Sequence, residues 1–330
     1  MTRPRLALST YIDGVLSGDR IILSQAITLI ESNLISDTIL AQELLQKIMP
    51  YTHKSIRIGI TGVPGVGKST FIEQFGLLLT NQNKKIAVLA IDPTSQISGG
   101  SIMGDKTRME NLSIDKKAYI RPTPAGNSLG GVARKTRETM LLCEAAGFEI
   151  ILIETVGVGQ SEIAVKQMTD FFLLLMLAGA GDELQGVKRG IMEVADILVI
   201  TKSDGDNQKN AARAKVEYEN ALHLFPIKEN KWSPSVMTCA ALQNQGIQPI
   251  WENIEQYIQH TKNNFSFENQ RQNQNLYWLY QNIKDVFEEK FYQSKNIEIN
   301  LKQYEINVKN GVIPPWQAAK ELWKIYENNF

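Results

Sequence analysis

The 330-residue chain has few of the residues that build disulfide or metal frameworks. Its two cysteines, Cys143 and Cys239, lie far apart and outside any Cys-x-x-Cys pair, which gives a disulfide framework or a zinc site little support. Cys143 falls within a helical pattern, and we interpret it as a small buried hydrophobic residue. The three histidines, His53, His223 and His260, are scattered, which argues against a metal-loading tract.

The chain also lacks an excess of charge of one sign and a long apolar run. Lys+Arg and Asp+Glu number 35 each, which removes the basic excess expected of a protein that binds nucleic acid or anionic lipid. The most apolar stretch, 171–177, is far shorter than the ~20 residues needed to cross a bilayer. No secretory hydrophobic segment is recognisable near the N-terminus. We therefore expect a cytoplasmic globular protein with neither nucleic acid nor membrane as a partner.

Hydrophobic spacing divides the chain into three parts. Residues 1–54 have helical spacing that ends at Pro50, which predicts an N-terminal helical extension. Between 55 and 260, short β-rich runs alternate with helical segments, a pattern typical of βαβ units. The expected strands are Ile56–Thr61, Ile86–Ile91, Tyr119–Arg121, Ile150–Ile153, Phe171–Leu177, Ile197–Thr201 and Val236–Thr238. The fold class is therefore α/β, with a mainly parallel sheet covered by helices on both faces.

Residues 261–330 combine Asn and Gln with aromatic residues at helical spacing. Two apolar stripes are expected there, one on each side of Pro314-Pro315; the first contains Leu276, Leu279, Ile283, Val286 and Phe287. A helical cap on the main domain and a dimerisation arm both fit this pattern. We assign the segment as a dimerisation arm of a homodimer, because it has much apolar surface for its size.

The sequence from Gly62 to Ser69 matches G-x-x-x-x-G-K-[ST] and lies between a predicted strand and a predicted helix, as this phosphate-binding motif requires. The fold is therefore of the P-loop NTPase type. Lys68 is expected to bridge the terminal phosphates and Ser69 to ligate magnesium, while backbone N–H groups converge on phosphate oxygens. The nucleotide-binding residues expected here are Gly62, Val63, Pro64, Gly65, Val66, Gly67, Lys68, Ser69 and Thr70. The glycine spacing, with its added lysine, does not match a dinucleotide fold.

Magnesium bound to a nucleotide needs hard oxygen ligands, which carboxylates at strand ends can supply. Asp92 and Glu154 each follow a predicted strand, and Asp105 lies in the loop between 98 and 108. We predict these three, with Ser69, as the magnesium ligands. Glu154-Thr-Val-Gly157 also reads as a variant of D-x-x-G, in which Gly157 N–H senses the γ-phosphate and the following segment rearranges on hydrolysis.

Two later segments predict guanine recognition. Thr201-Lys202-Ser203-Asp204 is similar to the N-K-x-D motif, with Asp204 accepting from two guanine donors that adenine lacks and Lys202 packing on the purine face. Thr201 in place of Asn puts one supporting hydrogen bond in question and predicts a lower affinity. Cys239-Ala-Ala-Leu242 is similar to the S-A-L/K loop that offers a backbone N–H to the guanine oxygen. The residues expected from this loop are Ala240, Ala241 and Leu242.

These motifs together resemble the MeaB/ArgK/MMAA-type GTPases, relatives of the SIMIBI-class metal-insertion GTPases. The resemblance covers nearly the whole chain; the residues that carry it are Gly62–Thr70, Asp92–Ser95, Gly99–Met109, Gly130–Glu138 and Glu154–Glu162. It implies a homodimeric chaperone that hydrolyses GTP slowly alone and faster with its partner, an adenosylcobalamin-dependent acyl-CoA mutase of the methylmalonyl-CoA mutase type. It implies Mg²⁺ and GTP or GDP as bound groups, with no cobalamin site of its own.

The glycine-rich segment 178–189 is similar to the third, partner-sensing switch of that family. Asp182 and Lys188 are the candidate catalytic residues there, alongside Lys68, and Lys188 would stabilise charge on the phosphates as an arginine finger does. A solvated loop with a helix-capping Asp182 is the alternative. Arg108, Arg134 and Lys135 are open to phosphate contact, partner contact or simple solvation.

Two other functions share the phosphate loop. A P-loop kinase that passes the γ-phosphoryl group to a small acceptor, as the name transport kinase attached to this family suggests, would need an acceptor pocket with a positioned base, and no candidate base is evident. A metal-insertion GTPase for nickel would need His- or Cys-rich tracts, which the scattered histidines do not form.

Overall fold

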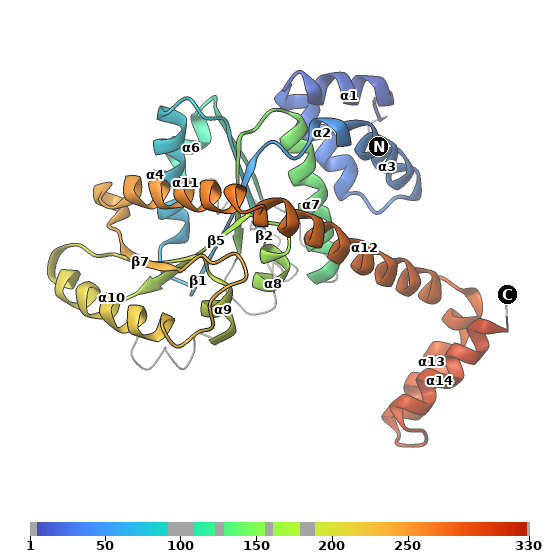
Figure 1. The fold of residues 1–330 in the computed structure, drawn as a ribbon. Helices are drawn as coiled ribbons and strands as arrows, with labels where there is room; N and C mark the ends of the chain where they lie inside the picture. The colour runs from blue at the N-terminus through green and yellow to red at the C-terminus, as the bar shows by residue number, and fades with distance from the viewer. Residues whose placement is uncertain (1–4, 92–108, 123–128, 156–160, 179–188, 329–330) are drawn as a thin grey trace. The chain divides into compact units, whose positions relative to one another are not determined.

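The computed structural model describes residues 5–91, 109–122, 129–155, 161–178 and 189–328 (Figure 1). The chain divides into two compact units, Met1–Gln274 and Asn275–Phe330, and the long helix α12 (Ser266–Tyr292) contributes residues to both. The first unit contains the whole sheet and the phosphate loop.

A seven-stranded sheet forms the centre of the first unit, with the strand order β3-β2-β4-β1-β5-β6-β7 and parallel pairing throughout. The strands are β1 (Ile56–Gly62), β2 (Ile86–Ile91), β3 (Ala118–Pro122), β4 (Ile150–Thr155), β5 (Phe171–Leu177), β6 (Ile197–Thr201) and β7 (Ser235–Thr238). All seven expected strands are confirmed, with small shifts at their ends. The central strands are buried on both faces, which explains their continuous apolar runs.

Helices cover both faces of this sheet (Figure 1). On one face, α4 (Lys68–Asn81), α6 (Glu110–Ile114) and α11 (Ile247–Asn263) enclose a core that contains Phe71, Phe75 and Trp251. Helices α7 (Leu129–Ala145) and α8 (Ser161–Lys166) lie against the other face, where a Cβ added to Gly59 of β1 would meet Val165 of α8 at 2.9 Å. Helices α9 (Arg189–Val194) and α10 (Gln208–Leu222) pack beside β5, β6 and β7. The α/β class is thus confirmed.

The N-terminal extension consists of α1 (Leu8–Leu16), α2 (Arg20–Glu31) and α3 (Ile35–Ile48), followed by a short 3-10 turn around Pro50. Its second helix is tied to the sheet through Glu31, whose carboxylate pairs with Arg121 at the end of β3. Lys135 of α7 donates to the Glu31 carbonyl and to Asn33 Oδ1, both at 2.6 Å. Lys135 therefore connects helix α7 to the N-terminal extension.

A buried network of charges lies where β1 and β5 begin. Arg57 is 3% exposed and donates to both carboxylate oxygens of Glu144 in α7, at 2.8 and 2.9 Å. Arg271 of α12 pairs with Asp170, the residue immediately before β5. Burial raises the pKa of Glu144, but the Arg57 guanidinium and the donors from Ser55 and His53 outweigh it, so the pKa lies below its usual value. Arg57 can therefore lie within strand β1, although it interrupts an apolar run, because Glu144 pairs with its charge.

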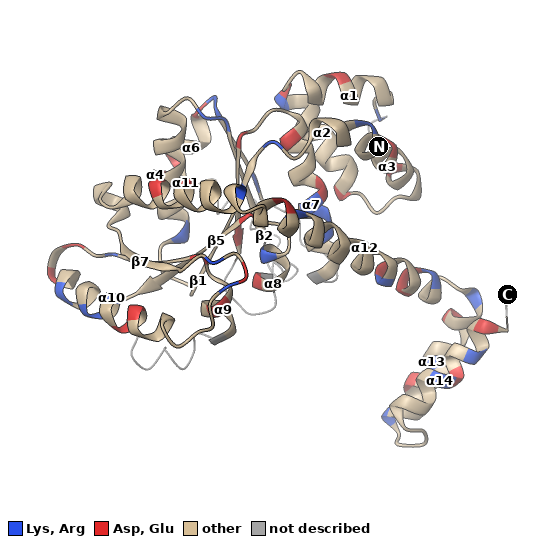
Figure 2. Ribbon diagram, viewed as in Figure 1, with Lys and Arg blue, Asp and Glu red and all other residues tan. Residues whose placement is uncertain are grey.

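The second unit contains the C-terminal part of α12, together with α13 (Lys295–Lys309) and α14 (Pro315–Glu327). Phe291, Trp323 and Tyr326 form an aromatic cluster with ring centroids 5.3 to 6.0 Å apart. Basic and acidic residues are interspersed along α10 and α12 rather than segregated (Figure 2). Among the described helices, none combines the length and apolarity that a membrane span requires.

Candidate nucleotide-binding site

The phosphate loop connects β1 to α4, and its glycines adopt backbone conformations that other residues rarely take. Gly65 and Gly67 have φ angles of 78° and 97°, in the left-handed region. Gly62 has a φ of 154°, and a Cβ there would lie 2.6 Å from the Leu175 carbonyl oxygen of β5. Helix α4 begins at Lys68, so its first N–H groups and its positive dipole end face the loop. This backbone geometry is typical of an anion-binding loop, as the sequence predicts.

The ammonium group of Lys68 lies over the loop. Its Nζ donates to the carbonyl oxygens of Gly62 at 2.9 Å and Val63 at 3.3 Å. Burial lowers the pKa of Lys68, while the nearby charges of Glu154 and Glu162 oppose this decrease. Bound phosphates would offer Lys68 stronger, charged acceptors than the two neutral carbonyls.

Glu154 lies on the adjacent strand β4, where it pairs in register with Ile60 of β1, and it is 8% exposed. The next residue, Thr155, donates its hydroxyl to Thr61 Oγ1 at 2.8 Å and so ties the end of β4 to the end of β1. Glu162 of α8 is 1% exposed, and its negative charge, like that of Glu154, opposes the decrease in the pKa of Lys68. Glu162 is the last residue of the segment Glu154–Glu162 that carries the family resemblance, and its effect on Lys68 is not predictable from the sequence.

A small hollow of about 70 Å³ lies beside the phosphate loop, and we call it the base hollow because residues of both predicted base motifs line it. Ala240, Ala241 and Leu242 contribute to its lining; Ala240 pairs with Gln245 in an isolated bridge, and Leu242 is 83% exposed. Lys202 adopts a φ of 54°, and its Nζ donates to the Gly65 carbonyl at 2.9 Å. The residues that line the hollow are Val66, Gly67, Thr70, Thr201, Lys202, Asp204, Ala240, Ala241 and Leu242. The two predicted base motifs thus meet at the phosphate loop.

Other predicted site residues lie outside the described residues. These are Asp92, Asp105, Gly157, Asp182 and Lys188, and their assignments stay predictions. Of the expected magnesium ligands, Ser69 and Glu154 lie in the described part of the chain. A hydroxyl in the first turn of α4 and a carboxylate at the end of β4 are hard oxygen donors, so this pair fits the chemistry of Mg²⁺.

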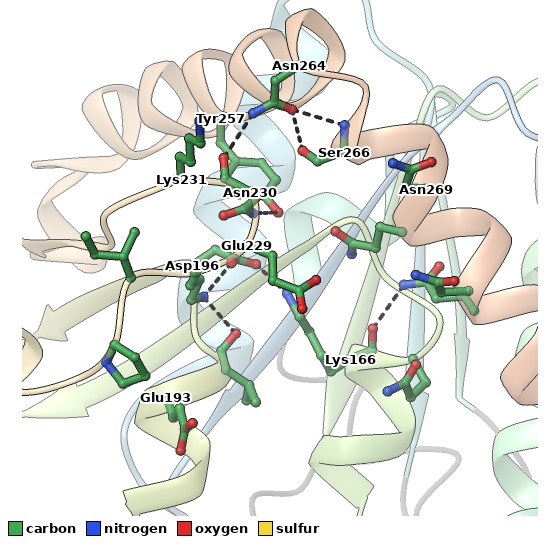
Figure 3. Close-up of a pocket in the computed structure, with 18 residues that line it drawn as sticks. Lys166, Glu193, Asp196, Glu229, Asn230, Lys231, Tyr257, Asn264, Ser266 and Asn269 are labelled. Carbon is green, nitrogen blue, oxygen red and sulfur yellow. Dashed lines mark hydrogen bonds and ion pairs between the residues drawn. The ribbon is translucent and has the colours of Figure 1, made fainter.

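A larger hollow of about 840 Å³ lies at the opposite edge of the sheet, before β5 and β6 (Figure 3). Asp196 is 1% exposed there and accepts from Lys166 at 2.7 Å and Lys228 at 2.8 Å. Figure 3 shows Asn230 beside Tyr257. The side-chain amide of Asn230 donates a hydrogen bond to the Tyr257 hydroxyl at 3.3 Å. Asp196, Lys166 and Lys228 thus pair with one another, and Lys228 also donates to the carbonyl oxygen of Ala195. The larger hollow contains no phosphate-binding motif, whereas the smaller one adjoins the phosphate loop, so we take the smaller hollow as the candidate nucleotide site.

The parallel sheet, the glycine cradle, Lys68 and the carboxylate at the end of β4 define a P-loop nucleoside triphosphatase. Comparison with known proteins makes this more specific. The model of the family "Methylmalonyl Co-A mutase-associated GTPase MeaB" matches residues 23–296. The chain belongs to this family and is a GTPase.

Similar proteins extend over nearly the whole chain. The Escherichia coli protein named GTPase ArgK is 42% identical over 98% of this chain and 98% of its own length. The mouse protein named methylmalonic aciduria type A homolog, mitochondrial, is 43% identical over 96% of this chain and 78% of its own length. A crystal structure titled LAO/AO transport system kinase is 37% identical, with a TM-score of 0.77 and coverage of 99% of this chain and 100% of that one.

Proposed function

We propose that this protein is a GTP-hydrolysing chaperone of an adenosylcobalamin-dependent acyl-CoA mutase of the methylmalonyl-CoA mutase type. GTP binding and hydrolysis would be coupled to loading, protection or repair of the mutase cofactor. The observation that carries the proposal is a family match that runs through both the phosphate loop and the base hollow. Relatives named for methylmalonic aciduria in animals support the same client.

Within this proposal, each end of the site has a separate task. Lys68 and the N-terminus of α4 hold the terminal phosphates, and Asp204 selects guanine. Ser69 and Glu154, with Asp92 and Asp105, would hold Mg²⁺, which would neutralise charge on the phosphates. Gly157 would report the γ-phosphate to the segment that follows it.

The partner would act through Asp182 and Lys188, which follow the end of β5. Strand β5 pairs directly with β1, the strand that leads into the phosphate loop. A partner that places Lys188 against the phosphates would therefore accelerate hydrolysis, because a cation there stabilises the charge of the transition state. The protein would hydrolyse GTP slowly alone.

Turnover of GTP with and without the purified mutase tests the proposal. We expect the mutase to raise the rate of phosphate release, and Lys188→Ala to reduce the rate of the stimulated complex. Lys209→Ala, which changes an exposed lysine of α10, is the matched control and should leave stimulation intact. A mutase that neither binds the GTP or GDP form nor alters turnover would contradict the proposal.

We also propose that the second unit forms the interface of a homodimer. One stripe of α12 is apolar yet exposed: Leu276 and Leu279 are each 52% exposed, Ile283 42% and Val286 48%. Such a contiguous apolar stripe on a helix is typical of an interface. Leu279→Glu together with Ile283→Glu should convert a dimer into monomers in light scattering, whereas Lys284→Glu on the same helix should not.

A small-molecule kinase is the second candidate, because a similar crystal structure is titled a transport system kinase. A kinase would transfer the γ-phosphoryl group to an acceptor, whereas a GTPase releases it as inorganic phosphate. Phosphorus NMR of a GTP reaction with candidate acceptors, such as basic amino acids, separates the two. We expect free phosphate to account for all GTP consumed; a phosphorylated acceptor would favour the kinase.

A further inference from the structure

The larger hollow, at the edge of the sheet opposite the phosphate loop, has a row of amide side chains along one side. All of its lining residues belong to the first unit, and several of them come from the first turns of α12. Figure 3 shows Asn269 on α12 and Lys231 on the opposite side of the hollow. The carboxamides of α12 that line it are Asn269, Gln270, Asn273 and Gln274, and we call them the carboxamide row.

The two glutamines of the carboxamide row are held in one orientation. Gln270 Nε2 donates to the carbonyl oxygens of Thr169 and Asp170, at 2.9 and 3.2 Å. Gln274 Nε2 donates to those of Lys166 and Thr169, at 3.1 and 2.8 Å. Because each amide nitrogen faces two acceptors, neither amide group can turn over without losing both bonds. Each Oε1 therefore keeps its capacity to accept.

The remaining capacity of the carboxamide row is not used within the described part of the chain. Gln274 is 4% exposed, and its Oε1 is buried without a donor among the described residues. A buried acceptor in this state is unfavourable, so a ligand N–H that reaches it would be stabilising. Asn269 and Asn273 are exposed and make no side-chain hydrogen bond to a described residue, so each offers both donors and an acceptor.

The spacing of the carboxamide row matches an extended polypeptide. Residues four apart on a helix are separated by about 6 Å along its axis. Along one edge of an extended chain, every second residue presents both its N–H and its C=O, at a repeat of about 6.6 Å. Asn269 with Gln270, and Asn273 with Gln274, thus form two amide pairs at nearly this repeat. In each pair the glutamine oxygen would accept an N–H, and the asparagine amide would donate to a C=O.

The rest of the lining favours a ligand without a large net charge. Three lysines and three carboxylates line the hollow: Lys166, Lys228, Lys231, Glu193, Asp196 and Glu229. Two of these lysines already pair with Asp196, so a polyanion would meet no excess of positive charge. Pro226 and Ile227 also line the hollow, and Ile227 is 85% exposed, so an apolar side chain of the ligand would gain contact there.

We propose that the larger hollow binds an extended polypeptide segment of a partner protein, and that the carboxamide row of α12 recognises its main chain. The segment has little net charge and carries an apolar side chain for Ile227. In this mode of recognition, main-chain hydrogen bonds supply affinity and side-chain contacts supply selectivity. The hollow and the phosphate loop lie at opposite edges of the sheet, so this binding does not depend on the guanine site.

A random library of short linear peptides displayed on phage supplies the probe. It is selected on the immobilised full chain and counter-selected on the double variant Asn269→Ala, Asn273→Ala. We expect enriched peptides, resynthesised and measured by fluorescence polarisation, to bind each single variant about five- to tenfold more weakly, the loss of one hydrogen bond. Gln272→Ala removes another exposed carboxamide of α12, one that does not line the hollow, and should bind them as the wild type does. A selection that enriches no peptide would overturn the proposal.

Methylation of single backbone nitrogens of an enriched peptide tests main-chain recognition on the wild-type chain, whatever the stability of the variants. Affinity should fall by about tenfold at two positions separated by one residue and change little at the residue between them, since only every second N–H faces Gln270 and Gln274. An equal effect at consecutive positions, or none at any, would overturn main-chain recognition. GTP turnover of Asn269→Ala and Asn273→Ala should equal that of the wild type; a parallel loss would trace weaker peptide binding to a damaged fold and overturn the assignment.

Discussion

Arg271 is expected to be one of the most sensitive positions for stability in the first unit. Its guanidinium donates to both oxygens of Asp170 at 2.7 Å, to the His53 carbonyl at 2.7 Å and to the Ser55 carbonyl at 2.6 Å. Asp170 is 1% exposed. Arg271→Met keeps most of the side-chain length but removes every donor, so a buried carboxylate loses its cation and two carbonyls lose a partner.

Removing one partner of a buried ion pair costs about 3–5 kcal/mol, because the remaining charge stays desolvated. For a unit of this size that corresponds to a decrease in melting temperature of about 10 °C. Asp170 retains the backbone N–H of Arg57 at 2.8 Å, which places the expected loss toward the lower end of the range. Urea unfolding of Arg271→Met at neutral pH measures it.

A double-mutant cycle separates this pair from general packing. Arg271→Met combined with Asp170→Asn should destabilise by less than the sum of the two single changes, since the double variant leaves no unpaired charge. Lys215→Met breaks an exposed pair with Glu219, at 3.8 Å and 44% exposure on each side, and should change stability by no more than about 0.5 kcal/mol. A loss below about 1 kcal/mol for Arg271→Met would refute the reasoning.

Three further changes probe the site and the opposite edge of the sheet. Lys68→Ala should abolish GTP binding, because it removes the cation over the phosphate loop; calorimetry that finds unchanged affinity would contradict the site. Asp204→Asn should weaken the preference for guanine, measured by competition with inosine triphosphate, since an amide cannot accept from both guanine donors. Burial raises the pKa of Asp196, but Lys166 and Lys228 outweigh it and hold that pKa below its usual value. The stability from Asp196 is therefore present above the unfolded pKa of about 3.9 and lost as pH falls through the folded value. Urea unfolding from pH 7 to 3 should show a shallower decrease for Asp196→Asn, and equal slopes would exclude this role.

The strands were predictable because burial on both faces leaves a signal in composition. The apolar run 171–177 became β5 with the same bounds, and Ile86–Ile91 became β2. Arg57 was harder to interpret, since a charge at the start of a strand has no local explanation. Its partner, Glu144, lies 87 residues away, and only the packing of α7 against the sheet brings the two together.

The candidate site shows the same division. The phosphate-loop motif is local, so the glycines, Lys68 and the start of α4 could be identified from their spacing alone. The interactions of Glu162 and Thr201 could not be predicted in that way. Glu162 acts on Lys68 from another helix, and the Thr201 hydroxyl reaches Val66 across 135 positions of sequence.

The sequence by itself determined the class of sheet, the phosphate loop and the resemblance to a GTPase family, because each depends on residues that are neighbours in the chain. Tertiary structure alone decided which carbonyls Thr201 and Lys202 hold, and how Arg271 is paired with Asp170. The physical reason is that a hydrogen bond depends on distance and direction between atoms, and those are fixed only after strands from distant parts of the chain have packed side by side.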